Sequence, residues 1–320
     1  MRVPGSVRVA HSPSHHPFVQ AIDPAAVVVD DPWSPDELRD ASVGAVHVHF
    51  GFEHLSPTEL TDRVHRVRSH GVRLVHTVHD VDNPHLTDQR PHHLRTAALV
   101  RLADAVTTLT ASAADDVERR WGRRPLVIPH PPLAATGPRA ATSARRCALL
   151  WLGTVRPNLD VDATIEFLSA VDVDVEVVVR EDAAERVPGA LRRAASASNA
   201  HGHRRSFTIR RRPTDAELED LVASSEVLIL PYAWGTHSGL VELATDLGVP
   251  CVTTDTGSRG DQGAVVAPRL ALADATRRVL ADGVVPHRPA AASLDSVRKA
   301  HRRLYASLEA AQNTAARSSQ

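Results

Sequence analysis

Short apolar runs alternate along the chain with segments in which apolar side chains recur every three or four positions. The runs are typical of buried strands and the segments of amphipathic helices. Alternating strands and helices predict an α/β fold built on parallel sheets. The predicted strands are residues 7–11, 26–29, 45–50, 73–79, 105–109 and 126–129 in the first half, and residues 148–153, 175–179, 206–210, 227–230, 251–254 and 264–267 in the second.

Local signals predict where several helices begin. Ser56-Pro-Thr-Glu59 and Thr214-Asp-Ala-Glu217 have the spacing of a capping box, in which the first and fourth residues bond each other's backbone N–H. Ser112 is expected to cap a further helix. The other predicted helices cover residues 92–104, 161–170, 188–196, 214–224, 239–247 and 293–313.

A break in this pattern predicts two domains. Residues 131–146 are rich in Pro, Ala, Gly, Thr and Ser and have no periodicity, as in an interdomain linker. Two doubly wound α/β domains are therefore expected, whose strand ends frame one cleft, with a last helix that returns to the first domain. The predicted boundaries are 1–131 for the N-terminal domain, 132–146 for the linker, 147–290 for the C-terminal domain and 291–320 for the crossing helix and tail.

Composition narrows the class of protein. The formal net charge of -1 gives no general attraction to nucleic acid or to anionic membranes. No apolar run approaches the roughly 18 residues that a membrane span needs, and no signal-peptide core is present at the start. Cys147 and Cys251 each begin an apolar run, which predicts buried free thiols and a cytoplasmic protein. Lys299 is the only lysine, an actinobacteria-like bias towards arginine.

The densest chemical signal lies at residues 227–250. An apolar run ends at Pro231, a turn from Gly235 to Gly239 follows, and a helix then carries Glu242 in its first turns. The first N–H groups of a helix and the positive end of its dipole together form an anion site. A carboxylate one turn further in is placed to bind the hydroxyls of a ribose, so the segment predicts a nucleotide-binding half-domain.

Together these features resemble the GT-B superfamily of glycosyltransferases, and more narrowly its retaining, family 4-like members with a Glu-x7-Glu signature. The resemblance covers most of the chain. Glu242 falls on the second glutamate, which binds the donor ribose in that family, and Gly235 and Gly239 fall on the glycines that approach the donor. Leu240 matches an apolar position before the glutamate. Residues 77–80, 104–110, 127–130, 152–156 and 254–257 match further family segments.

The chain also departs from the family pattern. Trp234 stands where the first signature glutamate is expected, and Thr154 stands at the position of a phosphate-binding arginine. Residues 158–160 replace the region that usually supplies a lysine, which leaves Arg156, close to Gly153, as the nearby cation. Residues 12–17 and 180–182 replace two loops that are usually rich in glycine.

The resemblance implies a hexosyltransferase that uses a nucleotide diphosphate sugar and an acceptor, with retention and without a metal or other cofactor. Glu242 would hold the ribose of the donor. A non-catalytic homologue that binds a ligand or partner is an alternative, because Trp234 and the missing lysine alter the donor site. A sugar-nucleotide epimerase is another. The implied donor site consists of Gly153, Arg156, Gly235, Thr236, His237, Ser238, Gly239, Leu240 and Glu242.

Histidines are frequent in the first half. His47 and His49 alternate on a predicted strand, so both imidazoles face one side. A metal site is not expected, because the spacing matches no zinc motif. His79 and Asp80, at the end of another strand, are candidate catalytic residues that touch the donor sugar or the acceptor hydroxyl. The alternative is a shell of hydrogen-bonded histidines beneath the cleft.

Two further groups are candidates for binding. His49, Phe50 and Glu53 lie at or just past a strand end and are expected on the acceptor side. Residues 119–124 form a basic cluster with one tryptophan. The cluster is interpreted as a solvated helix end, with phosphate or peripheral membrane contact as the alternative.

Overall fold

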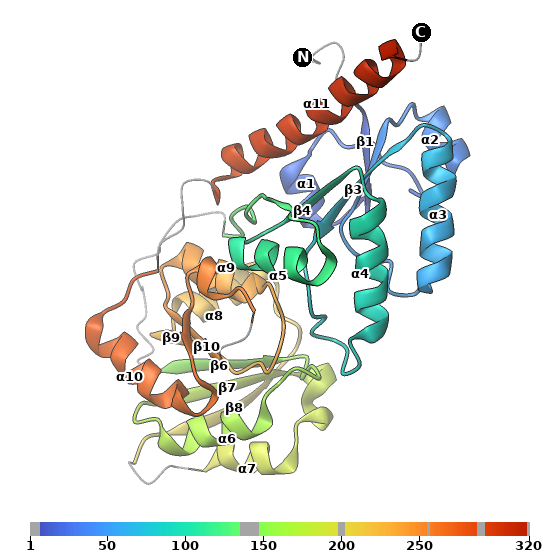
Figure 1. The fold of residues 1–320 in the computed structure, drawn as a ribbon. Helices are drawn as coiled ribbons and strands as arrows, with labels where there is room; N and C mark the ends of the chain where they lie inside the picture. Colours follow the sequence, from blue (N-terminus) through green and yellow to red (C-terminus); the bar gives the residue numbers. More distant parts are fainter. Residues whose placement is uncertain (1–6, 135–146, 198–201, 255–256, 287–291, 319–320) are drawn as a thin grey trace. The chain divides into compact units, whose positions relative to one another are not determined.

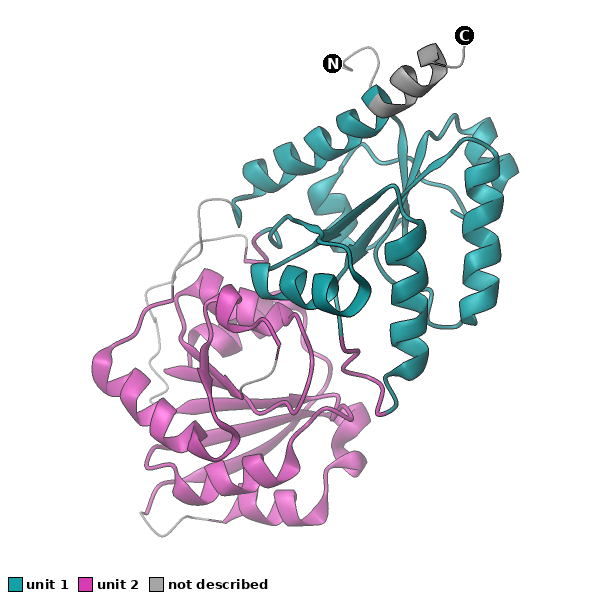
Figure 2. Ribbon diagram, in the orientation of Figure 1, with its two compact units in different colours: residues 1–81, 88–131, 289–320 teal, residues 82–87, 132–288 magenta. Residues whose placement is uncertain are grey.

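A computed structural model describes residues 7–134, 147–197, 202–254, 257–286 and 292–318 (Figure 1). The chain divides into two compact units (Figure 2). Residues 82–87 and 132–134, predicted to lie in the first domain and in the linker, belong to unit 2. The rest of the predicted linker, residues 135–146, lies outside the described residues. Unit 1 is residues 1–81, 88–131 and 289–320, and unit 2 is residues 82–87 and 132–288.

Unit 1 contains a five-stranded parallel sheet in the order β1-β2-β3-β4-β5. Because all strands are parallel, their carboxyl ends lie at one edge of the sheet. The predicted strand at residues 26–29 is wrong: only Val27 pairs, in an isolated bridge with Ala10, and Val28 is 57% exposed. The strands are β1 (Val9–Ser12), β2 (Ala45–Val48), β3 (Arg73–Val78), β4 (Ala105–Thr108) and β5 (Leu126–Val127).

The helices of unit 1 begin mostly where local signals predict. The capping box of Ser56 and Glu59 is present, and α3 follows it. The cap predicted at Ser112 is wrong, because the Thr110 side chain accepts the N–H of Ala113 and the helix already begins at Ala111. The helices are α1 (Pro17–Ile22), α2 (Pro35–Asp40), α3 (Pro57–Ser69), α4 (Arg90–Leu102), α5 (Ala111–Trp121) and α11 (Leu294–Ser318).

The last helix, α11, completes the core of unit 1. Arg298 donates from Nε to the carbonyl oxygen of Ala21 at 2.7 Å, at the end of α1. Burial of these apolar side chains in one cluster stabilises the docked helix. The cluster joins Val297, Leu304, Tyr305 and Leu308 of α11 to Val9, Phe18, Val19, Ile22, Ala45 and Val75.

Unit 2 contains a six-stranded parallel sheet in the order β11-β10-β9-β6-β7-β8. Its first strand lies in the middle, so the order reverses between β6 and β9, as in a Rossmann sheet. The capping box of Thr214 and Glu217 is present at the start of α8. The strands are β6 (Ala148–Gly153), β7 (Val175–Arg180), β8 (Arg205–Arg210), β9 (Val227–Leu230), β10 (Cys251–Thr254) and β11 (Val265–Ala267). The α-helices are α6 (Val161–Ala170), α7 (Gly189–Ser196), α8 (Asp215–Ala223), α9 (Gly239–Leu247) and α10 (Leu272–Asp282).

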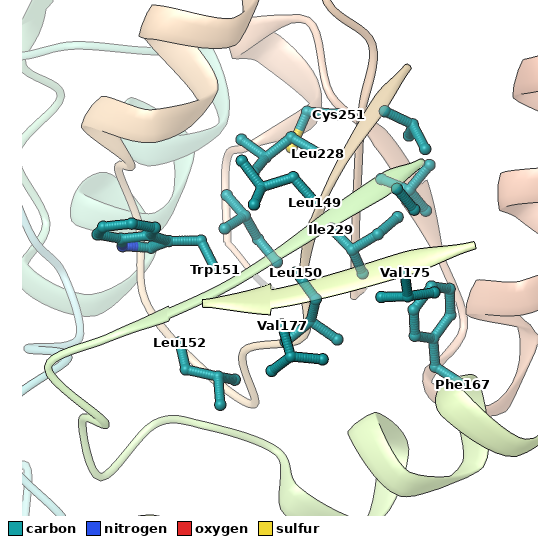
Figure 3. Packing of buried hydrophobic residues seen from close by; sticks show 14 of the residues in the cluster. Leu149, Leu150, Trp151, Leu152, Phe167, Val175, Val177, Leu228, Ile229 and Cys251 are labelled. Carbon is teal, nitrogen blue, oxygen red and sulfur yellow. The ribbon is translucent and has the colours of Figure 1, made fainter. Parts of the chain in front are cut away.

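The central strands of unit 2 are buried on both faces. Leu149, Leu150, Val177 and Ile229 are at most 1% exposed and pack with neighbouring strands and helices (Figure 3). This accounts for the nearly continuous apolar runs in the sequence, which are typical of parallel sheets covered by helices. Both cysteines are free, and only Cys251 is fully buried.

Candidate functional site

In unit 2, the turn after β9 is held from two sides. The carbonyl oxygen of Trp234 accepts a hydrogen bond from Asn158 Nδ2 at 2.8 Å and another from the guanidinium of Arg259 at 3.1 Å. Asn158 follows β6, whereas Arg259 follows β10. The turn is thus fixed at the carboxyl edge of the sheet, next to the reversal of strand order where such sheets bind ligands.

Two glycines let this turn touch the loop after β10. Gly235 has φ +130° and Gly257 has φ +62°. A Cβ on Gly257 would lie 2.0 Å from the carbonyl oxygen of Gly235, so a side chain at position 257 would collide with the backbone of the turn. Gly239, the other glycine of the predicted turn, is the exposed first residue of α9 and has no such contact. The close approach therefore requires Gly235 and Gly257.

Gln262 connects the start of α9 with Glu242. Its Oε1 accepts the backbone N–H of Ser238 at 3.1 Å, and its Nε2 donates to Glu242 Oε1 at 2.8 Å. His237 Nε2 lies 3.1 Å from the same carboxylate oxygen. Glu242 is buried, with 8% of its side chain exposed. The structure thus brings together the predicted residues His237, Ser238 and Glu242.

The side chains of Trp234 and Thr236 contact residues 82–87, which pack as part of unit 2. Trp234 Nε1 donates to the carbonyl oxygen of Asn83 at 3.1 Å. The N–H of Asp82 donates to Thr236 Oγ1 at 3.3 Å, and Thr236 is buried. The indole of Trp234, the residue at the position predicted for the first signature glutamate, therefore supports the fold of this loop.

The loop after β6 is bent and carries a cation. Gly153 has φ +53°, and a Cβ there would lie 2.6 Å from Trp151 Nε1. Val155 has φ +50°, a strained conformation for a β-branched residue and one that occurs preferentially at functional sites. Arg156 is exposed. Burial raises the pKa of Tyr232, while the charges of Arg156 and Arg259 act to lower it.

A cavity of about 540 Å³ opens in unit 2 near the carboxyl ends of its central strands. Arg269 forms an ion pair with Asp160, whose carboxylate also caps α6 by accepting the N–H of Ala163 at 3.0 Å. Burial works to raise the pKa of Asp160, but the bonds from Arg269 and Ala163 outweigh it and the pKa is lowered. The lining residues are Leu159, Asp160, Val161, Asp162, Ala233, Thr254 and Arg269.

In unit 1, His79 and Asp80 directly follow β3 and are partly buried. The ring of His79 packs edge-on against Phe18 and Phe50, with centroids 4.9 and 5.3 Å apart. The carbonyl oxygen of Asp80 accepts a hydrogen bond from His92 Nε2 at 2.9 Å. The predicted catalytic pair is thus held at the carboxyl edge of the sheet by aromatic packing and a backbone bond.

The predicted acceptor residues are in different surroundings. His49 is 2% exposed and bonds to two other histidines, so it lies beneath the surface. Phe50 is half-buried between the rings of His16 and His79. Glu53 is exposed and, within the described parts of the chain, makes no hydrogen bond or ion pair. The structure therefore brings Phe50 to His79 but leaves Glu53 apart.

The imidazoles of His47 and His49 lie on the same side of the sheet, as predicted, with ring centroids 4.0 Å apart. His47 is fully buried and bonds to Tyr305 and Thr77 through its two ring nitrogens, at 2.8 and 2.7 Å. Burial first, and neighbouring histidines second, hold the pKa of His47 and of His49 well below the usual range. His11, His47 and His49 each place one ring nitrogen within 4.8 Å of the others, the dimensions of a small metal site.

Several residues at these sites carried no signal in the sequence. Gln262, Arg259 and Asn83 act on the turn after β9 from distant segments. His11 was predicted only as part of a strand. No motif surrounds it in the sequence, and its pairing with His47 arises from the register of β1 and β2.

No protein-family model matches this chain, and none of the curated proteins matches it either. Solved structures resemble it over most of its length. An α,α-trehalose-6-phosphate synthase from Burkholderia multivorans has a TM-score of 0.59 at 14% identity, over 89% of this chain and 75% of that one. A sucrose-phosphate synthase from Thermosynechococcus elongatus has a TM-score of 0.58 at 15% identity, over 93% and 81%. Anabaena HepE in complex with UDP has a TM-score of 0.56 at 14% identity, over 88% and 81%.

At these identities the likeness establishes the fold. The two Rossmann-like units with parallel sheets are of the GT-B type, which confirms the predicted fold class. Among the described residues no helix is both long enough and apolar enough to cross a bilayer.

Proposed function

We propose that the protein is a glycosyltransferase that moves a hexose from a nucleotide diphosphate sugar to an acceptor. The proposal depends mainly on the buried carboxylate of Glu242, which Gln262 and His237 hold at the start of α9. This carboxylate lies at the carboxyl edge of a sheet with Rossmann strand order, the usual place for a nucleotide. HepE, which is similar in fold, was solved with UDP and with UDP-glucose, so a UDP-sugar is the first donor to test.

Glu242 and the first turn of α9 would bind different parts of the donor, the ribose and the diphosphate. The carboxylate of Glu242, which accepts a hydrogen bond from Gln262 and lies 3.1 Å from His237 Nε2, would also accept hydrogen bonds from the ribose hydroxyls of the donor. The first N–H groups of α9, around Gly239 and Leu240, would face the diphosphate. Retention of configuration is carried over from the family resemblance.

We assign to Arg156 the role of stabilising the negative charge of the leaving diphosphate. The region that supplies a lysine in the resembling family has structural roles here, because Asn158 holds the carbonyl of Trp234 and Asp160 caps α6. Arg156 is exposed on the strained loop that follows Gly153. Its positive charge acts to lower the pKa of Tyr232, so the two side chains interact electrostatically. A positioned cation stabilises charge that develops as the bond to the sugar breaks.

The substitution at Trp234 supports a second candidate function. Its indole bonds to the carbonyl of Asn83, so this position no longer offers a carboxylate to a sugar. A homologue that binds a nucleotide sugar without transferring the sugar is consistent with that change. A sugar-nucleotide epimerase would bind the same donor without needing an acceptor.

Binding and turnover of UDP-glucose separate these functions. Calorimetry should give binding to the wild type, and Glu242→Ala should lose about tenfold or more in affinity, because a hydrogen bond to a charged group contributes about 1.5–3 kcal/mol. Glu226→Ala is the matched control, since Glu226 is exposed and precedes β9 at the opposite edge of the sheet. Release of UDP from the donor is then followed for the wild type, Glu242→Ala and Arg156→Ala.

Each outcome selects one function. Binding with UDP release that both substitutions impair supports a glycosyltransferase. Binding without release supports the non-catalytic homologue, and isomerisation of the sugar without UDP release supports the epimerase. If neither UDP nor UDP-glucose nor other nucleotide sugars bind, the nucleotide site itself is wrong.

A further inference from the structure

Unit 1 contains a continuous string of three histidines that starts at a carboxylate. Asp23 Oδ2 lies 3.2 Å from His11 Nε2, and His11 Nδ1 lies 3.0 Å from His49 Nε2. His49 Nδ1 lies 3.2 Å from Nε2 of His79. His11 is fully buried and His49 nearly so, whereas the side chain of Asp23 is 19% exposed. The string therefore leads from a partly exposed carboxylate, through buried side chains, to His79 at the edge of the sheet.

The geometry is that of hydrogen bonds between imidazoles and not of ligands around a metal ion. The ring planes of His11 and His49 are almost parallel, at an interplanar angle of 5°, and their centroids are 5.2 Å apart. This separation is about the distance between their nitrogens plus two ring radii, so the two nitrogens point at each other. A tetrahedral zinc ion would lie off that line, and the lone pairs of its ligands would converge on the metal instead of pointing at each other.

The carboxylate at one end determines the tautomer at every later position. An ionised carboxylate only accepts, and a neutral imidazole has one donor and one acceptor nitrogen. His11 must then donate from Nε2 to Asp23 and accept at Nδ1. His49 donates from Nε2 and accepts at Nδ1, and His79 donates from Nε2. The lone pair of His79 is therefore on Nδ1, the nitrogen that is not used within the string.

We propose that Asp23, His11, His49 and His79 form a proton relay that makes Nδ1 of His79 a base. When Nδ1 of His79 takes up a proton, its Nε2 proton moves to His49 Nδ1. The Nε2 proton of His49 moves to His11 Nδ1, and the Nε2 proton of His11 moves to Asp23 Oδ2. Three neutral imidazoles with reversed tautomers and one protonated carboxyl result, and the carboxyl is exposed enough to release its proton to water.

Other titratable groups face the string from neighbouring elements. His47 lies beside it on β2, His301 and Tyr305 lie above it on α11, and Asp80 follows His79. Burial is the main cause that lowers the pKa of His301 to about 4, and it raises that of Tyr305 well above the usual range. Both side chains thus stay neutral near pH 7 and do not compete for the relayed proton.

The use of this base in catalysis rests on the proposed function, whereas the relay itself does not. Transfer of a sugar to a hydroxyl group releases the proton of that hydroxyl. A histidine supported by a carboxylate through hydrogen bonds suits the uptake of such a proton. His11, His49 and Asp23 would be positioning residues, because they act on the reacting groups only through His79.

Nitrogen NMR of the histidine side chains tests the relay without any substrate. In protein labelled with 15N-histidine, His79 should carry its proton on Nε2 at pH 7.5, with its signal assigned through His79→Gln. Asp23→Asn should lower the pKa of His79 by about one pH unit, since it removes a negative charge that acts through a low-dielectric interior. His11→Gln should leave His79 as a mixture of tautomers. His76→Gln, which removes a buried histidine outside the string, should change neither property.

Several results would overturn the relay. One is a proton on Nδ1 of His79, and another is a pKa that is the same in the wild type and Asp23→Asn. A third is one equivalent of Zn²⁺ bound by the wild type and lost in His11→Gln, which would make the cluster a metal site. If donor turnover is found, Asp23→Asn should also move the acid limb of the pH–rate profile down by about one unit, with partial recovery in Asp23→Glu. Absence of turnover contradicts the proposed function and leaves the NMR test valid.

Discussion

At the scale of single residues, the candidate donor site depends on backbone contact as much as on side chains. A Cβ added to Gly257 would lie only 2.0 Å from the carbonyl oxygen of Gly235. The turn before α9 and the loop after β10 therefore fit together only without a side chain at position 257. Gln262, a few residues further on, bonds both Ser238 and Glu242. The position of the carboxylate is thus set jointly by two loops.

Gly257→Ala should displace this turn. We expect a loss of about 3 kcal/mol of folding free energy, from the collision and from an unfavourable positive φ, together with weaker UDP binding. Gly283→Ala is a matched control, because Gly283 has φ +61° and an added Cβ would meet no atom within 4 Å. It should cost about 1–2 kcal/mol and leave binding unchanged. Urea unfolding and calorimetry measure both effects, and equal losses in the two variants would show that the contact with Gly235 is unimportant.

The candidate residues that were predictable from the sequence lie in local patterns. Glu242 follows a strand, a glycine turn and a helix start within one short segment, so its place was visible. Gln262 and Arg259 reach that segment only through the pairing of β9 with β10. Asp23 and His11 reach His49 only through the pairing of β1 with β2. One sequence without such pairings gives no sign of these partners.

At the scale of elements, α11 is joined to the sheet of unit 1 by a buried polar contact. Tyr305 shares a hydrogen bond with His47 Nδ1 at 2.8 Å, and His47 is bonded on its other side to Thr77. Thr77 in turn lies 2.6 Å from the hydroxyl of Thr107. Successive strands and the helix are therefore connected through one row of polar groups inside an otherwise apolar cluster.

Tyr305→Phe should destabilise the protein by about 1–3 kcal/mol, because it leaves a buried ring nitrogen of His47 without its partner. Tyr232→Phe changes the only other tyrosine, whose hydroxyl is 3.5 Å from the carbonyl of Trp151, at the limit of a hydrogen bond. That control should cost less than about 1 kcal/mol. Thermal unfolding of both variants compares the two contacts. Similar melting temperatures would mean that the bond between Tyr305 and His47 is not stabilising.

Most elements were predictable because buried strands and amphipathic helices each require a characteristic spacing of apolar residues along the sequence. The errors have local physical causes. Residues 26–29 are apolar enough for a strand, but Pro24 and Pro32 border this segment and only Val27 pairs. Helix α5 begins earlier than predicted, because Thr110 competes with Ser112 as the cap and makes the bond to Ala113. Thr110 and Ser112, two positions apart, are both suitable cap residues, and only the backbone conformation chooses between them.

At the scale of the whole molecule, the buried histidines make stability depend on pH. Burial lowers the pKa of His76 and of His301 from 6.5 to about 4. Between these values the unfolded chain binds protons that the folded chain does not, so stability is full above pH 6.5 and falls as the pH drops towards 4. Each group should account for about 3 kcal/mol over this interval.

Urea unfolding at pH 7.5 and at pH 5 measures this dependence. The wild type should have a clearly lower midpoint at pH 5, and His76→Gln should show a smaller difference between the two pH values than the wild type does. The substitution is expected to lower stability at pH 7.5 as well, so the comparison uses the difference and not the absolute midpoint. A midpoint independent of pH would mean that these imidazoles are solvated in the native state.

The position of α11 in the chain has a consequence for biosynthesis. Unit 1 is interrupted by both segments of unit 2, and its last helix is translated after residue 288. On the ribosome, unit 2 therefore has all of its strands before unit 1 has Tyr305 to cover His47. The strands that carry His11, His47 and Thr77 are therefore translated before unit 2 is complete, whereas the helix that covers them is translated after it.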